Sequence, residues 1–381
     1  MALCPVPEHA GAVPIRAHEP LCFLMPRQVQ WQFGINISLN GQYKSMSKRV
    51  VVFGATGTVG AYACLYLKEK GYMVTAVGHR RDDNGFFADY GIPYYSADIS
   101  RKEDFDNLPD ESFDAAVNLA GMLPARMKGY CPQKYIDINV TGCLNVLDYC
   151  VKAGCKRFVY SQSISDVAYL CGNKTPIPSD AESRFPLNND HSVYSITKNA
   201  ASSLIDHYSA KYGFKFFILR FPNIYLYHPN PRYYVDGVEK WQGYRLMIAK
   251  AMKGEPISVW GDPGRVHDVV YVKDCCQIIE RSIGAEDAPS GRYNVGTGVG
   301  TTLEDQIRGI IEVFSPEGSK SELSYDPSKP SATEYVFDVS KTEKYLGYRP
   351  QYDYLAYLRD FKKEMEAQRF VKLWGPDKSL G

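Results

Sequence analysis

The fold of this chain is decided by the stretch Arg49-Val50-Val51-Val52-Phe53-Gly54-Ala55-Thr56-Gly57-Thr58-Val59-Gly60. Its first five residues are mostly β-branched and are typical of a short buried strand. A glycine turn follows, and residues 58–70 have the pattern of a helix that ends at Gly71. Such a turn lets the backbone approach a pyrophosphate, and the next helix offers unpaired N–H groups. The stretch therefore predicts a dinucleotide site, and the alternative is a plain tight turn in another α/β protein.

Length and composition describe an ordinary globular protein. The chain has 381 residues, of which 45% are hydrophobic, and a formal net charge of +1. This length is enough for a sizeable core and about two to three domains. The nearly balanced charge carries no electrostatic signature of nucleic-acid binding. Because no apolar run approaches about 18 residues, we expect no contact with a membrane through a spanning helix.

The ten cysteines and seven histidines form no metal-binding pattern. No C-x-x-C pair and no His/Cys cluster has the spacing of a zinc site. The adjacent Cys275 and Cys276 are interpreted as two small core residues rather than as a redox pair. We therefore expect no metal, reduced thiols and a cytoplasmic protein.

Residues 1–47 differ from the rest of the chain. They contain five prolines, two acidic residues and no sustained hydrophobic period. We expect them to form a disordered N-terminal extension, with Met46 as an alternative initiator just before the first strand. A transit peptide is the competing interpretation, but such peptides carry more arginine and serine.

Strands and helices alternate after the glycine turn. The expected elements are strands at 73–77, 93–98, 115–121, 157–161 and 214–220, and helices at 135–153 and 192–212. Such alternation implies right-handed crossovers and an α/β fold, a doubly wound parallel sheet of the Rossmann type. Beyond Phe221 the alternation is lost. We therefore expect a dinucleotide domain over 48–221, to which 265–285 returns, and a smaller, mainly substrate-binding lobe over 222–381.

A tyrosine followed four residues later by a lysine places both side chains on one face of a helix. The nearby ammonium then lowers the pKa of the phenol, which becomes a usable acid or base near neutral pH. The spacing occurs four times, at Tyr66–Lys70, Tyr130–Lys134, Tyr194–Lys198 and Tyr325–Lys329.

Sequence context favours Tyr194–Lys198 among these pairs. It lies early in a helix that follows the fifth strand, and the end of that strand carries Ser161-Gln162-Ser163. Two of the other pairs span a proline, which argues against a regular helix, so Tyr130–Lys134 is expected in a loop. The pair on the first helix lies several turns from the expected nicotinamide. The alternative for Tyr194–Lys198 is an exposed helix pair without chemistry.

Further motifs extend from the glycine turn to the C-terminal part of the chain. In chain order they are Gly54-x-x-Gly57-x-x-Gly60, Asp98-Ile99, Asn118-Leu119-Ala120-Gly121, Asn139-Val140-x-Gly142, Ser163, Tyr194-x-x-x-Lys198, Leu219-Arg220-Phe221-Pro222-Asn223, His267-Asp268, Tyr293-Asn294-Val295-Gly296 and Leu346-Gly347-Tyr348-x-Pro350. In these motifs the chain resembles the extended short-chain dehydrogenases/reductases, the NAD(P)-dependent epimerase/dehydratase family. The resemblance covers the chain from the first strand to the proline at the end of this series.

The resemblance implies a hydride-transfer site. Lys198 is expected to hold the nicotinamide ribose and to lower the pKa of Tyr194, while Tyr194 and Ser163 contact the reacting sugar hydroxyl. Asn139 is expected to brace the site, and Asn223 to meet a substrate diphosphate. The implied cofactor-binding residues are Gly54, Thr56, Gly57, Thr58, Val59, Gly60, Arg80, Asp98, Ile99, Leu119, Ala120, Gly121, Lys198 and Phe221.

The end of the second strand departs from the family pattern. Gly78 stands where NAD-binding members carry an acidic residue, and Arg80 and Arg81 follow it. A missing carboxylate and a nearby guanidinium both favour a 2′-phosphate. The sequence therefore predicts an NAD(P) cofactor with NADP favoured over NAD. The alternative is that both arginines are solvated loop charges.

Two other departures concern the substrate. Ile164-Ser165 follows the active serine where dehydratases of the family carry an Asp-Glu pair, which disfavours a dehydratase. His267 stands where many relatives have an arginine that reaches the nucleotide phosphates. Either Arg265 or Arg245 replaces that arginine, or the substrate lacks a nucleotide.

The leading hypothesis is a sugar epimerase that acts on a nucleotide-linked sugar. Hydride passes to the bound cofactor, a transient ketone turns in the site, and the hydride returns to the opposite face. The runner-up is an NADPH-dependent carbonyl reductase with the same three catalytic residues. A non-catalytic redox sensor or scaffold is the third interpretation. The resemblance also implies a homodimer that pairs through two helices.

Overall fold

The computed structural model describes residues 47–123, 130–188, 190–235 and 238–378. The expected extension over residues 1–47 lies, except for Ser47, outside this part of the chain. None of the described helices has both the length and the apolar character that a membrane span requires.

The central element is one sheet of seven strands in the order β13-β6-β5-β4-β1-β2-β3. Its strands are β1 (Arg49–Phe53), β2 (Met73–Gly78), β3 (Tyr94–Ser96), β4 (Ala115–Asn118), β5 (Arg157–Ser163), β6 (Lys215–Phe221) and β13 (Gly291–Asn294). Every neighbouring pair is parallel. The chain runs from β1 to β3 and then crosses back to β4, so the strand order reverses between β1 and β4. The predicted doubly wound Rossmann-type sheet is confirmed.

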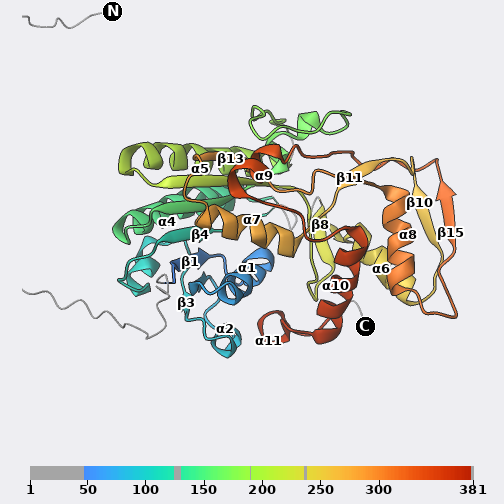
Figure 1. Ribbon diagram of the computed structural model, residues 1–381, viewed down its shortest axis with the longest axis horizontal. Coiled ribbons are helices and arrows are strands. Elements are labelled where there is room, and N and C mark those ends of the chain that lie inside the picture. The colour runs from blue at the N-terminus through green and yellow to red at the C-terminus, as the bar shows by residue number, and fades with distance from the viewer. Residues whose placement is uncertain (1–46, 124–129, 189, 236–237, 379–381) are drawn as a thin grey trace, which may run out of the picture. The chain divides into compact units, whose positions relative to one another are not determined.

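The side chains of β1 alternate between two apolar clusters because this strand is buried on both faces. Val50 and Val52 pack with α1 and α7 on one face. Val51 and Phe53 pack with α4 and α5 on the other face (Figure 1). These helices are α1 (Thr58–Glu69), α4 (Gly142–Lys152), α5 (Asp190–Tyr212) and α7 (Val272–Gly284).

The helix expected over residues 135–153 begins earlier and changes its hydrogen bonding along the way. It begins with α3 (Pro132–Tyr135), whose first turn contains the proline. An N–H in that turn has no acceptor within the helix, so its absence in proline costs no hydrogen bond. A π-helical turn, η3 (Ile136–Thr141), follows and continues into α4. The prediction of a loop at Tyr130–Lys134 is therefore wrong for Lys134, which lies in α3.

Two strand ends differ from the prediction at positions that matter for the site. β4 ends at Asn118 rather than at residue 121, because the side-chain oxygen of Asn118 accepts from the N–H of Ala120 at 3.1 Å and turns the chain out of the sheet. β5 continues beyond its predicted end to Ser163, because β6 pairs with it as far as Phe221. Ser163 is therefore the last residue of a strand in the sheet.

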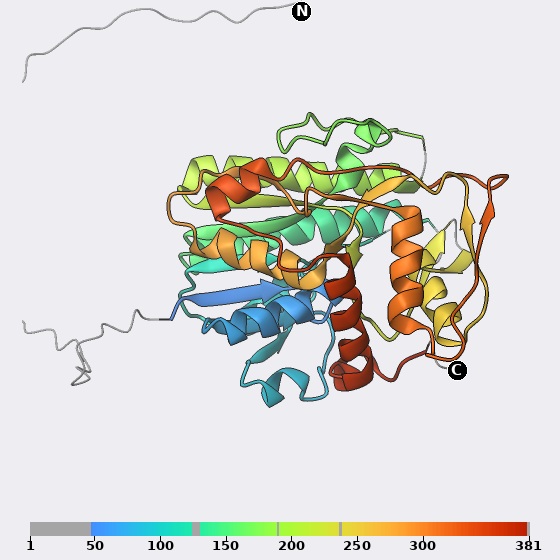
Figure 2. The same cartoon turned by 45° about the vertical axis from the view of Figure 1, so that its right-hand side comes forward.

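Beyond the sheet's carboxyl edge lies a group of short strands and helices, toward which the arrowhead of β1 points in Figure 2. The paired strands are β7 (Ile224–Tyr225) with β12 (Val270–Tyr271), β8 (Arg232–Val235) with β9 (Val238–Trp241), β10 (Ile257–Trp260) with β15 (Leu323–Asp326), and β11 (Val266–Asp268) with β14 (Gly300–Thr302). The helices of the C-terminal half, apart from α7, are α6 (Gly243–Met252), α8 (Leu303–Phe314), α9 (Ser340–Leu346), α10 (Tyr354–Ala367) and α11 (Val371–Trp374). Short helices earlier in the chain are α2 (Phe86–Asp89), η1 (Lys102–Asn107), η4 (Ile164–Asp166) and η5 (Ala168–Leu170).

The chain returns to the sheet over a longer stretch than 265–285. After α7 the strand β13 pairs with β6 and extends the sheet by one strand. Its sequence, Gly-Arg-Tyr-Asn, has no apolar run, and the fully buried Tyr293 is its one large core side chain. A period-based analysis therefore had no signal for this strand.

Candidate active site

The glycine turn lies where the carboxyl ends of β1 and β4 meet. Gly54 has a φ of +79°, and a Cβ there would lie 2.6 Å from the backbone nitrogen of Ala120. A Cβ on Gly60 would lie 2.1 Å from the carbonyl oxygen of Gly54. Both positions therefore require glycine. The turn thus lies against Leu119 and Ala120, two of the predicted cofactor residues.

The first turn of α1 has the properties of an anion site. Its N-cap is the exposed Gly57, and no side chain caps the helix. The N–H groups of Thr58, Val59 and Gly60 lie in the turn where a helix offers no acceptor of its own. Together with the positive end of the helix dipole, they suit a phosphate group. These residues fit the pyrophosphate of a dinucleotide.

The end of β2 has no room for a carboxylate. A Cβ on Gly78 would lie 2.8 Å from Oγ1 of Thr56 and 3.1 Å from the hydroxyl oxygen of Tyr94. The guanidinium of Arg80, predicted beside a 2′-phosphate, donates instead to the carbonyl of Leu373, because α11 packs on this loop. Arg81 is exposed. Arg80 is therefore engaged with the C-terminal helix.

Asp98 and Ile99, the two residues predicted to contact adenine, differ in how available their side chains are. The carboxylate of Asp98 is half-buried at the exit of β3 and accepts from the N–H and the hydroxyl of Ser100, at 3.0 and 2.7 Å. The side chain of Ile99 is 6% exposed, and a Cβ on Gly142 would lie 2.7 Å from its Cδ1. Its carbonyl accepts from Nδ2 of Asn145 at 2.8 Å. Ile99 therefore packs on α4, and Asp98 is the more available of the two.

Tyr194 and Ser163 are in direct contact. Tyr194 lies near the start of α5, is 7% exposed, and has its hydroxyl hydrogen-bonded to Ser163 at the end of β5. The oxygen of Ser163 also accepts from the N–H of Ser165 at 3.2 Å. Its own hydroxyl hydrogen is thus left for Tyr194. The phenol and the serine can share one substrate oxygen, as the sequence predicts.

Lys198 lies one turn further along α5, near Gly121 and the end of β5. Its Nζ is 3.5 Å from Oγ of Ser161 and 4.1 Å from the ring centroid of Tyr160. A Cβ on Gly121 would lie 3.7 Å from the same Nζ. The structure thus brings the three predicted catalytic residues to the edge where β4 and β5 end.

Burial is the main influence on the pKa values of Tyr194 and Lys198. Burial raises the pKa of Tyr194 to about 12, although its hydrogen bond with Ser163 acts in the other direction. Burial lowers the pKa of Lys198 to about 7. That Lys198 lowers the pKa of Tyr194 stays a prediction, because burial is the largest influence on the pKa of each group here. At neutral pH Tyr194 is therefore protonated in this arrangement, and it accepts a proton only when a nearby positive charge lowers its pKa.

The π-helical turn η3 positions the brace Asn139. Its side-chain oxygen accepts from the N–H of Met122 at 2.8 Å, and its Nδ2 donates to Oγ1 of Thr197 at 3.1 Å. Asn139 is 2% exposed, so both bonds are shielded from water. They tie the segment after β4 to the turn of α5 that carries Lys198. π-Helical turns are often found at functional sites.

Residues 50–296 match the model of the NAD dependent epimerase/dehydratase family. The chain belongs to this family. The resemblance inferred from the motifs is confirmed, and so is an NAD(P)-dependent enzyme of the extended short-chain dehydrogenase/reductase type.

Several relatives of the chain are named as UDP-sugar 4-epimerases. The chain is 24% identical to a putative UDP-glucose 4-epimerase of Methanocaldococcus jannaschii over 306 residues, which are 80% of this chain and 94% of the relative. It is 25% identical to the UDP-glucuronate 4-epimerase of Thermodesulfobacterium geofontis, over 79% of this chain and 91% of the relative.

Solved structures of the same kind share the fold. The UDP-glucose 4-epimerase of Thermotoga maritima with UDP-glucose is 22% identical, with a TM-score of 0.66 over 84% of this chain and 99% of that chain. The Thermus thermophilus UDP-glucose 4-epimerase in complex with NAD is 23% identical, with a TM-score of 0.62 over 83% and 99%.

Asp166, the acidic residue nearest to the family's dehydratase position, has a structural role. Nε and Nη2 of Arg220 bind its two carboxylate oxygens at 3.0 and 3.1 Å, and both side chains are 1% exposed. Ser183 donates to the same carboxylate at 3.1 Å. Asp166 is therefore committed to a buried ion pair and has a structural role.

The candidate substrate residues are not equally available. Asn223 is exposed just after β6. Arg265 is ion-paired with Glu334 at 2.8 Å and with Asp262 at 3.7 Å. Arg245 is 2% exposed and donates to the carbonyl of His228 at 2.6 Å. Arg245 is thus a core residue, and Arg265 reaches a phosphate only by leaving its carboxylates.

His267 does not replace the missing arginine as a cation. Burial lowers its pKa below the usual range for a histidine, although a hydrogen bond to the carbonyl of Thr333 acts in the other direction. Nε2 of Gln306 lies 3.5 Å from its second ring nitrogen. The imidazole is therefore neutral at physiological pH and is held between two partners.

Trp374 is the residue near the cofactor turn that the sequence analysis missed. Its indole N–H donates to the carbonyl of Thr56 at 3.0 Å. The chain holds only four tryptophans, and this one lies in a short C-terminal stretch without a hydrophobic period. Its rarity was the one available signal.

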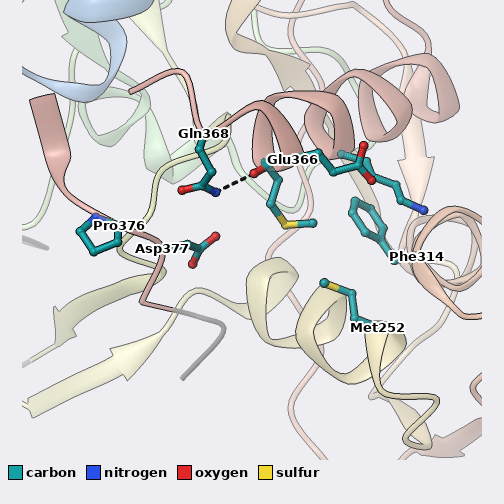
Figure 3. A pocket seen from close by; sticks show the side chains of 8 residues that line it. Met252, Phe314, Glu366, Gln368, Pro376 and Asp377 are labelled. Carbon is teal, nitrogen blue, oxygen red and sulfur yellow. Dashed lines mark hydrogen bonds between the residues drawn. The ribbon is translucent and has the colours of Figure 1, made fainter. Parts of the chain in front are cut away.

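A cavity of about 550 Å³ lies where α6, α8, α10 and the C-terminal residues meet (Figure 3). It is lined by Met252, Phe314, Lys362, Met365, Glu366, Gln368, Pro376 and Asp377. None of these is a predicted site residue, and none follows a strand of the large sheet. Ligands of open α/β sheets bind at the carboxyl ends of the strands. We therefore place the active site at that edge and not in this cavity.

Replacement of Lys198 by methionine is expected to stabilise the dinucleotide-free protein. The unfolded chain keeps this lysine charged up to its ordinary pKa of 10.5, whereas the folded chain releases the proton above about 7. Between these values the unfolded state binds more protons, so the free energy of unfolding of the wild type rises with pH. At pH 7 we expect the free energy of unfolding of Lys198→Met to exceed that of the wild type by about 2–4 kcal/mol.

The measurement is urea denaturation of both proteins at pH 7 and pH 10. The difference between them should shrink toward pH 10, because the free energy of unfolding of the wild type rises until the pH reaches the ordinary pKa of the lysine. A difference that stays constant across this range would show that Lys198 is not a desolvated ammonium.

Proposed function

We propose that this protein is a 4-epimerase of a nucleoside-diphosphate-linked sugar. The observation that carries the proposal is the contact of Ser163 with Tyr194, one helical turn from Lys198 and beside the cofactor turn. The names of the relatives, UDP-glucose 4-epimerase and UDP-glucuronate 4-epimerase, support both the substrate class and the position that is inverted.

The residues divide the chemistry among them. A bound dinucleotide supplies the hydride acceptor and donor at its nicotinamide. Ser163 holds the oxygen of the sugar's reacting hydroxyl by a hydrogen bond. Tyr194 takes the proton from that oxygen as the ketone forms and returns it after the ketone has turned. General acid–base catalysis of this kind contributes about two to four orders of magnitude in rate.

Lys198 determines when Tyr194 acts as a base. A phenolate buried at this position is costly, as the raised pKa of Tyr194 indicates. A protonated Lys198 one turn away offsets that cost through its charge. The pair therefore works as a unit: the protonated lysine supports the phenolate, and the neutral lysine leaves a proton-donating phenol.

Retention of the cofactor distinguishes the epimerase from the carbonyl reductase. An epimerase returns the dinucleotide to its starting state in each turnover, and tight retention suits this cycle. Freshly purified protein is denatured, and the released dinucleotide is identified by chromatography. We expect about one equivalent of oxidised dinucleotide. Protein that releases none and consumes NADPH with a carbonyl substrate would instead be a reductase.

We propose in addition that the dinucleotide is NADP rather than NAD. The support is the missing carboxylate at Gly78 and the exposed guanidinium of Arg81 next to the engaged Arg80. We expect Arg81→Ala to raise the Kd for NADP about tenfold, because a charge-assisted contact to a phosphate is lost. The Kd for NAD in the same variant should stay within about twofold. A wild type that prefers NAD, with no change in Arg81→Ala, contradicts the proposal.

A further inference from the structure

The C-terminal segment, residues 370–378, lies against the two loops that surround the dinucleotide site. The indole N–H of Trp374 donates to the carbonyl of Thr56 in the glycine turn. The carbonyl of Leu373 accepts from Arg80, and that of Lys372 accepts from Nδ2 of Asn84 at 2.8 Å. Figure 1 shows α11 beside α2, which follows the loop of Arg80. One short helix thus contacts the backbone of the turn and the loop after β2.

Aromatic packing holds the C-terminal segment in place. The rings of Trp374 and Phe370 stack with their centroids 4.4 Å apart and an interplanar angle of 24°. Phe370 lies 4.5 Å from the ring of Tyr62 on α1 and 5.6 Å from that of Phe86 on α2. The segment is therefore anchored on the two helices that follow β1 and β2.

The other end of the segment is attached to the chain that follows Asn223. The N–H of Lys378 donates to the carbonyl of Pro229 at 2.8 Å, and the hydroxyl of Tyr227 donates to Asp377 at 2.9 Å. The rings of Trp374 and His228 lie 4.6 Å apart. The segment thus spans from the cofactor turn to the substrate side of the molecule.

A contact from outside the glycine turn can restrict its backbone before a ligand binds. Gly54 and Gly57 give its backbone more conformational freedom than other residues would, and ordering that backbone costs free energy when a ligand binds. A bond from outside to the carbonyl between them, that of Thr56, restricts the turn before binding. The side chain of Thr56 also fills the space above Gly78, so a shift of this residue alters the ribose side of the site.

We propose that residues 370–378 are a positioning element of the dinucleotide site, in which Trp374 holds the glycine turn and Leu373 holds the loop of Arg80. This inference rests on the proposed use of a dinucleotide. The segment preorganises the turn, and preorganisation raises affinity by lowering the ordering cost of binding. Affinity for the dinucleotide therefore depends on a part of the chain far from the glycine motif in sequence.

The test is the Kd of the dinucleotide-free protein for NADP and for NAD, measured by calorimetry on three variants. Trp374→Phe keeps the ring stack and removes the N–H donor. Tyr62→Phe acts on the same aromatic cluster, but its hydroxyl donates to the carbonyl of Tyr227 and not to the turn. Trp260→Phe makes the same substitution at a tryptophan on β10 that is 56% exposed.

We expect Trp374→Phe to raise the Kd about three- to tenfold, because the variant loses one hydrogen bond to the turn. At saturating dinucleotide its kcat should stay within about twofold of the wild type. Tyr62→Phe and Trp260→Phe should bind as the wild type does, although Tyr62→Phe lowers the thermal stability.

Two results would overturn the inference. One is an unchanged Kd in Trp374→Phe. The other is an equal rise in Tyr62→Phe, which would mean that general loosening of the cluster weakens binding. If the wild type itself binds neither dinucleotide, the proposed function fails rather than the positioning role of the segment.

Discussion

Tyr194→Phe is expected to lower kcat by about 10²- to 10⁴-fold while leaving the affinity for the dinucleotide unchanged. The phenylalanine keeps the ring in its buried position and removes the hydroxyl that contacts Ser163 and can exchange a proton with the substrate. The rate of sugar inversion is measured under saturating substrate and cofactor. The loss should appear equally in kcat and in kcat/KM, because the lost interaction is made only in the transition state.

Tyr208→Phe is the matched control for this substitution. Tyr208 lies on the same helix, and its hydroxyl donates to Asp148 at 2.6 Å, away from the reacting groups. Its removal should leave kcat within about twofold. Wild-type turnover by Tyr194→Phe would show that another group moves the proton and would remove the basis of the proposed mechanism.

Arg220→Met is expected to lower the free energy of unfolding by about 3–5 kcal/mol. The substitution leaves the carboxylate of Asp166 buried without its cation, in a position that is 1% exposed. Nη1 of Arg220 also donates to the carbonyl of Ser179 and to the side-chain oxygen of Asn294, both at 3.1 Å, so these acceptors lose a donor too. The measurement is chemical denaturation at pH 7.

The double variant Asp166→Leu/Arg220→Met separates the ion pair from the packing around it. The double variant has neither charge, so it lacks the unpaired buried carboxylate of Arg220→Met. It should therefore recover part of the stability that the single variant loses. A single variant as stable as the wild type would mean that water or another cation replaces Arg220, and the ion pair would then carry little of the fold.

Local pattern was enough to predict the cofactor turn. Val50 to Phe53 are apolar at every position because β1 is buried on both faces, and Gly54 and Gly60 after it are required by contacts under 3 Å. The pair Tyr194–Lys198 was chosen by its place after the fifth strand. The structure confirms that placement, since the end of β5 and the first turns of α5 meet there.

Features that depend on tertiary contacts could not be predicted in this way. The pKa of Tyr194 is set by burial, and a helix spacing says nothing about burial. The π-helical turn that places Asn139 has the same sequence pattern as an ordinary helix. The contact of Trp374 with Thr56 joins positions that are 318 residues apart, so no local signal relates them.

By the proposed function, this family member inverts a sugar carbon by removing a hydride and returning the same one. The most direct measurement is incubation of the protein as purified, without added dinucleotide, with UDP-glucose, UDP-N-acetylglucosamine and UDP-glucuronate carrying deuterium at C4. NMR of the products then reports both the configuration and the label. We expect the 4-epimer of at least one of these sugars, with its deuterium retained at C4. No epimer from any of the three, or an epimer whose deuterium has exchanged with water, would contradict the account.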